Sequence, residues 1–406
     1  MNKFFKKGFK YVDLFAGIGG FHQAMKQLNG ECVFASEIQQ ETAQTYFENY
    51  EISAFSDITK LGPEVIPEHD VLCAGFPCQS FSKAGFQKGF DDIRGTLYFD
   101  IVRILEHHVD SYGGPKYILL ENVRNLVSHD QKRTWEKIRR SLIKLGYNVI
   151  NTPLIVSPHY FGIPQLRERA VILGVKIDHF DRDIDINIEK KPKNSCDMNS
   201  IIVNKDTDEY KLDNFKINEY EEKVLTMWDD FIQILKINEK IGFPIWEVEF
   251  DKEYDISNMP NWKQNIIMKN RNFYKKYKDE IDLWRKQYDY LNWVKATHRK
   301  FEWQVNNKIN SVFEGIIQFR PSGVRVKQPT EFPALVAIVH VPIIGKYRRY
   351  ITPREAANLQ SFPQNFKINK NVRLAYKQFG NAVNVDVIRT VFEKFVNFVE
   401  GDSMYA

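Results

Sequence analysis

The first 180 residues alternate short apolar runs with longer segments whose apolar residues recur every three to four positions, and this alternation restricts the fold most. Short apolar runs that end at glycine or polar residues predict strands, and the longer segments predict amphipathic helices. The predicted strands are 10–15, 32–35, 70–74 and 117–120, and the predicted helices are 21–28, 40–49, 97–109 and 133–145. Strands that alternate with helices indicate a doubly wound α/β sheet.

The composition changes near residue 184, where a stretch rich in Lys, Asp, Glu, Tyr and Trp begins and continues to about residue 310. Six of the 7 tryptophans lie between Trp228 and Trp303. Apolar residues recur at helical spacing over 224–235 and again over 273–288. Because so many aromatic residues can form a core, we interpret this stretch as a separate, partly helical domain whose tryptophans are core residues. Helix-start residues return at 352–355, and an amphipathic helix is predicted at 385–399.

Composition and charge exclude several classes of protein. A hydrophobic content of 43% and a charged content of 27% are ordinary for a globular chain. No apolar run approaches the ~20 residues of a membrane-spanning helix, and the basic N-terminus lacks the apolar core of a secretory signal. The 4 cysteines form no CxxC pair and have no histidine at zinc spacing, so we expect no metal site, no disulfide framework and a cytoplasmic location. The net charge of +5 is compatible with a polyanionic partner.

The segment Phe76-Pro77-Cys78-Gln79 follows a predicted buried strand. Functional residues of parallel sheets lie at the carboxyl ends of strands, and the proline fixes the backbone that precedes the thiol. A glycine-punctuated, charged loop follows from 81 to 95, which is typical of a segment that closes over a substrate. Most cysteines are small core residues, and we interpret Cys32 and Cys73 in that way. For Cys78 the sequence favours a nucleophile once its surroundings are considered.

The stretch 13–21 combines a strand end, a glycine-rich turn and a helix start. Glycines let a ligand approach the backbone, and a helix N-terminus favours a carboxylate or phosphate. Glu37 ends the next predicted strand, a position at which a carboxylate commonly hydrogen-bonds the hydroxyl groups of a ribose. The spacing differs from G-x-G-x-x-G and therefore argues against NAD. An adenosine-type cofactor site and a tight packing turn explain this segment equally well.

Two further groups of polar residues stand near predicted strands. Glu121 ends a buried strand, where a carboxylate is costly unless it is paired or functional. Arg167 and Arg169 alternate and would share one face of a strand. They fit either a site or a surface ladder of ion pairs.

Together these segments resemble the bacterial DNA (cytosine-5) methyltransferases, the AdoMet-dependent enzymes of restriction–modification systems. The matching pieces, in the family's order, are 13–21, Glu37, Asp57, 75–82, 121–123, 165–169, 320–337 and 378–383. The resemblance implies a Rossmann-like AdoMet-dependent methyltransferase domain with a doubly wound mixed sheet over 1–183. It also implies a smaller target-recognition domain over 184–350, across a DNA-binding cleft, and a return to the catalytic domain over 351–406.

The resemblance also implies a mechanism. Cys78 would add to carbon 6 of a flipped-out cytosine, so that carbon 5 can attack the sulfonium methyl group of AdoMet. Glu121 would bind ring nitrogen 3 and the exocyclic amine, Arg169 would hold the ring oxygen, and Arg167 would help to order the site. No side chain is an evident base for the carbon-5 proton, so water is expected in that role.

Cofactor and DNA contacts are implied in the same way. The expected cofactor-binding residues are Phe15, Ala16, Gly17, Gly19, Gly20, Glu37, Ile38, Asp57, Ile58, Pro77, Leu97, Asn381 and Val383. Many relatives have an aromatic residue where this chain has Ile38, so AdoMet is expected to bind more weakly. The expected DNA-binding residues are Gln79, Ser82, Lys83, Lys88, Arg94, Arg320, Arg325, Lys346 and Arg348, and Lys327 and Arg349 extend this basic series. The last helix is expected to pack back onto the first domain and to bring Asn381 to its pocket.

Two other functions fit parts of the pattern. A transfer-RNA cytosine-5 methyltransferase would use the same chemistry, but its known members have a much smaller insert than the middle stretch of this chain. A catalytically silent nucleic-acid-binding homologue would have no reason to keep Cys78, Glu121 and Arg169. We therefore expect a monomeric enzyme that acts on double-stranded DNA. A cognate restriction endonuclease as functional partner and an orphan enzyme are equally compatible with the sequence. The recognised DNA sequence does not follow from residue spacing.

Overall fold

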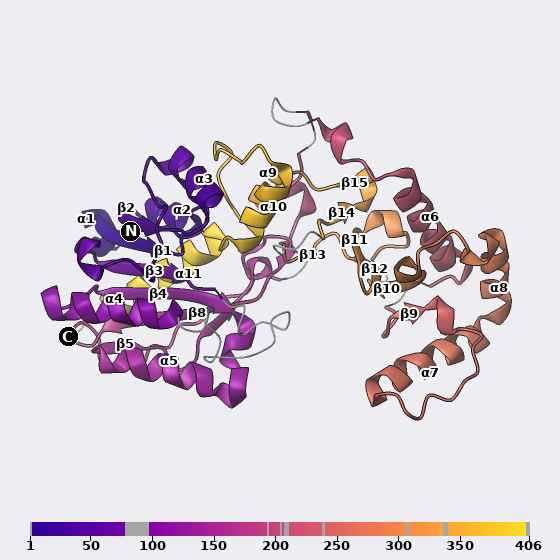
Figure 1. The fold of residues 1–406 in the computed structure, drawn as a ribbon, viewed down its shortest axis with the longest axis horizontal. Helices are drawn as coiled ribbons and strands as arrows, with labels where there is room; N and C mark the ends of the chain where they lie inside the picture. The colour runs from indigo at the N-terminus through magenta and orange to yellow at the C-terminus, as the bar shows by residue number, and fades with distance from the viewer. Residues whose placement is uncertain are drawn as a thin grey trace. The chain divides into compact units, whose positions relative to one another are not determined.

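The computed structural model describes residues 2–77, 97–192, 195–203, 205–206, 211–237, 240–305, 308–335 and 340–402. The chain forms two compact units (Figure 1). Unit 1 comprises 1–196 and 356–406, and unit 2 comprises 197–355. The sequence placed the corresponding boundaries at 183/184 and 350/351.

Unit 1 contains a seven-stranded mixed sheet. Its strands are β1 (Phe9–Leu14), β2 (Gly30–Ser36), β3 (Val71–Gly75), β4 (Tyr117–Val123), β5 (Tyr147–Val149), β6 (Leu154–Val156) and β8 (Arg169–Lys176). The order is β2-β1-β3-β4-β8-β5, and β6 pairs with β8 outside this path. The first four strands run parallel, and β8 runs antiparallel to β4, β5 and β6. The doubly wound mixed sheet is thereby confirmed.

Helices cover both faces of this sheet. They are α1 (Lys3–Lys7), α2 (Gly20–Gln27), α3 (Gln40–Tyr50), α4 (Leu97–Tyr112), α5 (Arg133–Lys144), α9 (Pro353–Leu359), α10 (Val372–Asn381) and α11 (Val385–Asp402). Helix α11 packs against α2, and α4 and α5 lie on the opposite side of the sheet (Figure 1). Tyr117 of β4 contacts Phe392 and Phe395 of α11 edge-on, so the C-terminal helix packs onto the first domain as expected.

The central strands are apolar on both faces because helices bury both. Val71, Leu72, Cys73 and Ala74 of β3 have no solvent exposure. Such continuous apolar runs are typical of parallel strands. The carboxyl ends of β1 to β4 lie at one edge of the sheet, with Leu14 opposite Ala74 and Gly75 opposite Glu121. Polar residues that follow these strands are therefore brought together.

In its described residues, unit 2 has a six-stranded sheet and three α-helices of its own. The strands are β9 (Ile245–Trp246), β10 (Lys300–Gln304), β11 (Ile316–Arg320), β12 (Gly323–Lys327), β14 (Ile343–Ile344) and β15 (Arg349–Tyr350), in the order β15-β14-β11-β12-β10-β9. The helices are α6 (Glu219–Ile234), α7 (Asn261–Lys276) and α8 (Lys278–Gln287). The short strands β7 (Gln165–Leu166) and β13 (Phe332–Pro333) complete the set of described strands.

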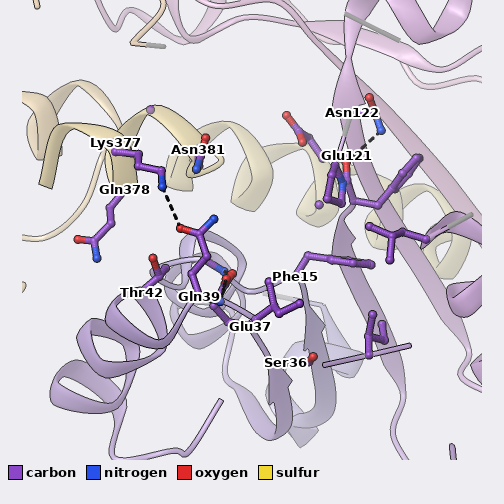
Figure 2. A pocket seen from close by; sticks show the side chains of 18 of the residues that line it. Phe15, Ser36, Glu37, Gln39, Thr42, Glu121, Asn122, Lys377, Gln378 and Asn381 are labelled. Atoms are coloured by element: carbon purple, nitrogen blue, oxygen red, sulfur yellow. Dashed lines mark hydrogen bonds between the residues drawn. The ribbon is translucent and has the colours of Figure 1, made fainter. Parts of the chain in front are cut away.

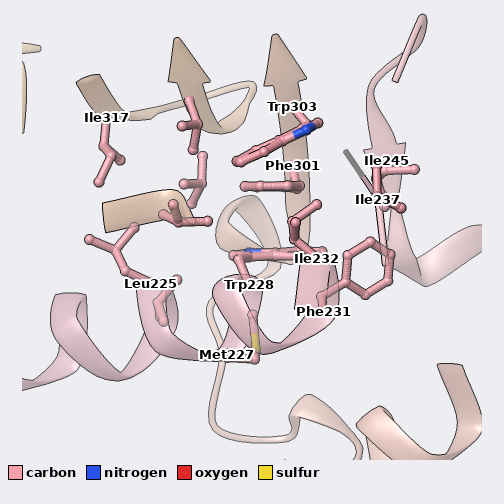
Figure 3. Packing of buried hydrophobic residues seen from close by; sticks show 14 of the residues in the cluster. Leu225, Met227, Trp228, Phe231, Ile232, Ile237, Ile245, Phe301, Trp303 and Ile317 are labelled. Carbon is pink, nitrogen blue, oxygen red and sulfur yellow. The ribbon is translucent and has the colours of Figure 1, made fainter. Parts of the chain in front are cut away.

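Tryptophans form the centre of unit 2, as the sequence predicted. Trp228 of α6 stacks on Phe301 of β10 with ring centroids 4.6 Å apart, and Trp303 and Trp284 are equally buried (Figure 3). The indole nitrogen of Trp228 donates to the carbonyl of His298, so burial leaves that polar group satisfied. Trp246 and Trp293 are only partly buried, and Trp262 is 61% exposed.

The apolar spacing over 273–288 fits one helix, but the structure has two. Tyr277 separates α7 from α8 with φ −120° and ψ 34°, which is not helical. Phe273, Ile281 and Trp284 nevertheless all pack against the same core. The buried side chains therefore keep their helical spacing in the sequence, although the helix itself is interrupted at Tyr277.

No helix within the described ranges is long and apolar enough to cross a membrane.

Candidate active site

A cavity of about 440 Å³ opens at the carboxyl edge of the unit 1 sheet (Figure 2). Phe15, Glu37 and Pro77 line it just beyond the ends of β1, β2 and β3, and Glu121 lines it from the end of β4. Four successive parallel strands thus each deliver a residue to one place. This is where ligands bind in open α/β sheets.

The glycine-rich turn and Glu37 are joined directly. The Gly17 N–H donates to Glu37 Oε2 over 3.0 Å, and the Gln39 N–H donates to Oε1 over 2.7 Å. Burial raises the pKa of Glu37, and these two hydrogen bonds oppose that rise. Phe15 adopts φ +56°, a left-handed conformation that is rare outside glycine and marks a constrained turn. The carboxylate and the turn therefore form one preorganised wall.

A second wall comes from 56–59 and from the start of α4. Asp57 Oδ1 accepts from the backbone N–H and the hydroxyl of Thr59, and these hydrogen bonds lower the pKa of Asp57. Ile58 and Leu97 supply apolar surface beside it. Ile38 also lines the cavity but is 63% exposed, so one flank of this wall is open to solvent.

Helix α10 closes the cavity from the C-terminal part of the chain. Asn381 lines the cavity, as the sequence predicted, together with Lys377, Gln378 and Gly380. Figure 2 shows the Lys377 ammonium group reaching Gln39, whose side-chain oxygen accepts over 3.3 Å. Gln378 donates to the Thr45 hydroxyl over 3.0 Å, which ties α10 to α3.

Glu121 and the two arginines meet at the other end of the cavity. Arg169 Nε lies 2.9 Å from Glu121 Oε1, and both side chains are largely buried. The Arg167 guanidinium donates to the carbonyl of Ala382 over 3.0 Å and is 3% exposed. A surface ladder is therefore wrong for these arginines, although Arg124 and Glu168 nearby do form an exposed pair at 2.6 Å.

Not every residue expected at the cofactor lines the cavity. Ala16, Gly19, Gly20 and Val383 are not among its lining residues: Gly19 faces Tyr50, and Gly20 packs against Val383. Further lining residues that were not among the expected site residues are Ser36, Gln39, Thr42, Ser56, Thr59, Gly75, Phe76, Asn122, Val123, Lys377, Gln378 and Gly380. Most of these adjoin an expected residue in sequence, and that adjacency was the available signal.

Cys78 itself lies outside the described residues, as do Gln79, Ser82, Lys83, Lys88 and Arg94. The described chain reaches Pro77, which lines the cavity. The side chain of Asn122 donates to the Phe76 carbonyl over 3.2 Å and fixes the backbone beyond β3. The residue before Cys78 thus belongs to the same cavity as Glu121.

Three of the expected DNA-binding residues of unit 2 form ion pairs within the unit. Arg325 and Arg320 flank Glu302 at 2.6 Å and 3.4 Å, and Arg348 pairs with Glu222. Lys346 is exposed. Arg349 does not fit the phosphate series, because it is buried and forms a two-pronged ion pair with Glu355 at 2.7 Å and 2.8 Å.

Comparison with known proteins shows the family to which the chain belongs. The family model of the C-5 cytosine-specific DNA methylases matches residues 9–397. The type II methyltransferase M.AluI of Cellulosimicrobium cellulans is 31% identical, with 96% of this chain and 92% of that protein covered. M.DsaV of Dactylococcopsis salina is 33% identical over 97% of this chain and 88% of its own length.

Solved structures share the fold. A DNA modification methyltransferase encoded within an E. coli prophage has a TM-score of 0.55 at 20% identity, with 96% of this chain and 98% of that chain covered. The S. pombe Dnmt2 methyltransferase gives 0.52 at 17% identity, with the same coverage. The fold, the site and the sequence match lead to one assignment: the chain belongs to the family of C-5 cytosine-specific DNA methylases.

Proposed function

We propose that this DNA cytosine-5 methyltransferase acts through a covalent Cys78 adduct on a cytosine flipped out of double-stranded DNA. One observation carries the proposal: a single cavity joins the Glu37-bearing wall to the Glu121–Arg169 pair. A methyl donor and an acceptor base must share one enclosed space for transfer to occur, since proximity supplies much of the rate.

The residues present fit AdoMet, the cofactor that the family implies. Glu37 would accept hydrogen bonds from the ribose hydroxyls, Phe15 would face the adenine, and Asp57 would accept from the adenine amine. Ile38, Ile58, Pro77, Leu97 and Asn381 would complete the pocket. AdoMet supplies an electrophilic sulfonium methyl group, and no metal is needed for this transfer. Because Ile38 is exposed at the pocket rim, its contribution to adenine binding would be small.

The chain's own residues would make cytosine reactive. The Cys78 thiolate adds to carbon 6, and the electron pair of the 5,6 double bond becomes available at carbon 5 for the methyl group. Base removal of the carbon-5 proton then restores the double bond and expels the thiolate. We propose water as this base. Atoms and charge would balance, because carbon 5 gains the methyl group, the carbon–sulfur bond to that methyl group breaks to leave a neutral thioether, and one proton is released.

Glu121 and Arg169 would bind the cytosine edge. Glu121 would hydrogen-bond or protonate nitrogen 3 and accept from the exocyclic amine, while Arg169 would hold the ring oxygen. Their 2.9 Å contact holds the two side chains next to one another before a base arrives. Arg167, bound to the Ala382 carbonyl, would order this corner of the cavity.

Unit 2 is proposed as the target-recognition domain. Duplex DNA hides the target carbon, so the base must leave the stack. Gln79, Ser82, Lys83, Lys88 and Arg94, which lie outside the described residues, are proposed to contact the DNA. Arg320, Arg325, Lys346 and Arg348 are proposed phosphate contacts. Relatives at 31% and 33% identity are named type II methyltransferases, which favours DNA over transfer RNA as substrate. We infer a bacterial, cytoplasmic monomer in a restriction–modification system whose endonuclease is a functional partner.

Trapping the adduct tests the covalent step. In duplex DNA with 5-fluorocytosine at the target, no proton can leave carbon 5 after methylation, so the Cys78 adduct should persist through denaturing electrophoresis when AdoMet is present. Cys78→Ala should give no adduct while it still binds DNA and AdoMet. An adduct of equal yield in Cys78→Ala would overturn the assignment of the nucleophile.

A further inference from the structure

Tyr50, the last residue of α3, reaches the glycine-rich turn that precedes α2. Its hydroxyl lies 3.1 Å from the carbonyl oxygen of Ile18 and 3.2 Å from that of Gly19. The same hydroxyl accepts a hydrogen bond from the Gln23 side chain over 3.1 Å. One phenol therefore donates to the turn and accepts from the first turns of the following helix.

The glycine-rich turn and the Tyr50 ring are in close contact. A Cβ atom added to Gly19 would lie 2.3 Å from the Tyr50 ring, and Gly19 already adopts φ +86°. On its other side the ring stacks on His22, with centroids 3.7 Å apart and an interplanar angle of 18°. His22 is held in turn by the Tyr46 hydroxyl at 2.8 Å. The ring has no alternative position that keeps these contacts.

These contacts fix the direction of the amide groups at the start of α2. In a trans peptide the C=O and N–H groups point in opposite directions, so holding the Gly19 carbonyl also aims the Gly20 N–H. The Gly19 carbonyl also accepts from the Gln23 N–H over 3.0 Å. The carbonyl end of the Gly19–Gly20 peptide is therefore held by groups of the protein itself. Helix α2 begins at Gly20. The first N–H groups of a helix have no partner within the helix, and an anion can bind them.

Helix α3 thus connects both parts of the cofactor wall. Gln39 at its start binds the Glu37 carboxylate, which itself holds the Gly17 N–H. Tyr50 at its end holds the other half of the same turn. The turn from 16 to 20 is therefore held at one end by Glu37, which the cap of α3 binds, and at the other end by Tyr50, the last residue of α3.

We propose that the Tyr50 hydroxyl is a positioning residue that orients the turn at 18–20 for the amino-acid carboxylate of AdoMet. This inference rests on the proposed function and adds a residue that does not line the cavity. Burial raises the pKa of Tyr50, so the hydroxyl keeps its proton and can donate throughout the neutral range.

Two ligands separate this role from a general effect on folding. S-adenosyl-L-homocysteine carries the amino-acid carboxylate, and 5′-methylthioadenosine is the same nucleoside thioether without it. In Tyr50→Phe we expect the Kd for S-adenosyl-L-homocysteine to rise about tenfold, the loss typical of one hydrogen bond. The Kd for 5′-methylthioadenosine should stay within about twofold. The KM for AdoMet should rise in parallel, with kcat at saturation nearly unchanged.

Tyr147→Phe is the matched control. Its hydroxyl is also buried and donates to a backbone carbonyl, that of Pro115 at 2.8 Å, away from the cavity. This variant should bind both ligands like the wild type. If Tyr50→Phe does not fold, Gln23→Met, which removes the donor to the Tyr50 hydroxyl, should show the same selective loss at smaller size.

Every other outcome would contradict the inference. Equal weakening of both ligands would mean that Tyr50 only stabilises the fold, and unchanged binding of both would mean that its hydroxyl is irrelevant. Failure of the wild type to bind S-adenosyl-L-homocysteine would instead contradict the proposed function, so the two failures are distinguishable.

Discussion

Glu121 and Glu168 lie near the same pair of strands, β4 and β8, but in different environments. Glu121 is 9% exposed and pairs with Arg169 inside the cavity, whereas Glu168 pairs with Arg124 at the surface. Glu121→Gln keeps the shape but removes the proton-transfer group. We expect kcat to fall by about 10²-fold or more, the usual contribution of a general acid, with the Kd for DNA changed by less than about threefold.

Glu168→Gln is the control for Glu121→Gln, because it makes the same chemical change in an exposed pair. It should leave kcat within about twofold. Single-turnover kinetics with saturating DNA separate the two effects. If Glu121→Gln weakened DNA binding as strongly as it slowed transfer, Glu121 would have been assigned the wrong role.

Two buried histidines predict how stability depends on pH. Burial lowers the pKa values of His69 and His108 to about 4, and the Nε2 atom of each lacks a hydrogen-bond partner within the described part of the chain. Unfolded histidine has a pKa of about 6.5, so between pH 6.5 and 4 the unfolded chain takes up protons that the native chain does not. The free energy of unfolding must therefore fall as the pH falls through this window, by on the order of 3 kcal/mol for His69 alone.

Urea unfolding measured between pH 7 and pH 5 tests this dependence. A His69→Gln/His108→Gln double variant should show a flatter profile than the wild type, whatever its stability at pH 7. Identical slopes would show that these rings do not remain neutral in the native state.

At the scale of elements, Glu247, the residue that follows β9, joins separate segments of unit 2 through buried ion pairs. It is 1% exposed and lies 2.6 Å from both Arg285 of α8 and Arg299. No sequence pattern pointed to this network, because its members are distant in sequence and each looks like an ordinary surface charge. Glu247→Ala removes the buried carboxylate that both arginines share and leaves Arg285 with only Asp251, at 3.3 Å, so it should destabilise unit 2 by about 3–5 kcal/mol.

Tryptophan fluorescence suits this measurement, because six of the 7 tryptophans lie in unit 2. The control is Glu222→Ala, which removes an exposed ion pair with Arg348 and should cost at most about 1 kcal/mol. Comparable losses in the two variants would contradict the importance of burial.

The elements of unit 1 were predictable because local pattern and tertiary burial agree there. The predicted helix 40–49 is α3 at Gln40–Tyr50, and the predicted strand 70–74 is β3 at Val71–Gly75. The sequence pattern gave a wrong prediction where long-range contacts determine the structure. The alternating Arg167 and Arg169 do not share a strand, since β7 ends at Leu166 and β8 begins at Arg169. They share the cavity instead.

For the whole molecule, the sequence predicts a catalytic unit interrupted by a second unit, and the model divides the chain at 196/197 and 355/356. Many of the residues that line the cavity belong to short motifs and were found from the sequence. The residues that hold those motifs in place, such as Tyr50 and Lys377, were not. Their contacts span tens to hundreds of positions, so only the fold brings them together.

The most direct test of the account is base-resolution methylation mapping of a plasmid that carries this gene, beside the same plasmid with Cys78→Ala. We predict methylation at carbon 5 of cytosine in one short sequence motif, and none with the variant. A plasmid without methylated cytosine, although the wild-type protein is folded and binds AdoMet, would contradict the central claim that this chain is a DNA methyltransferase.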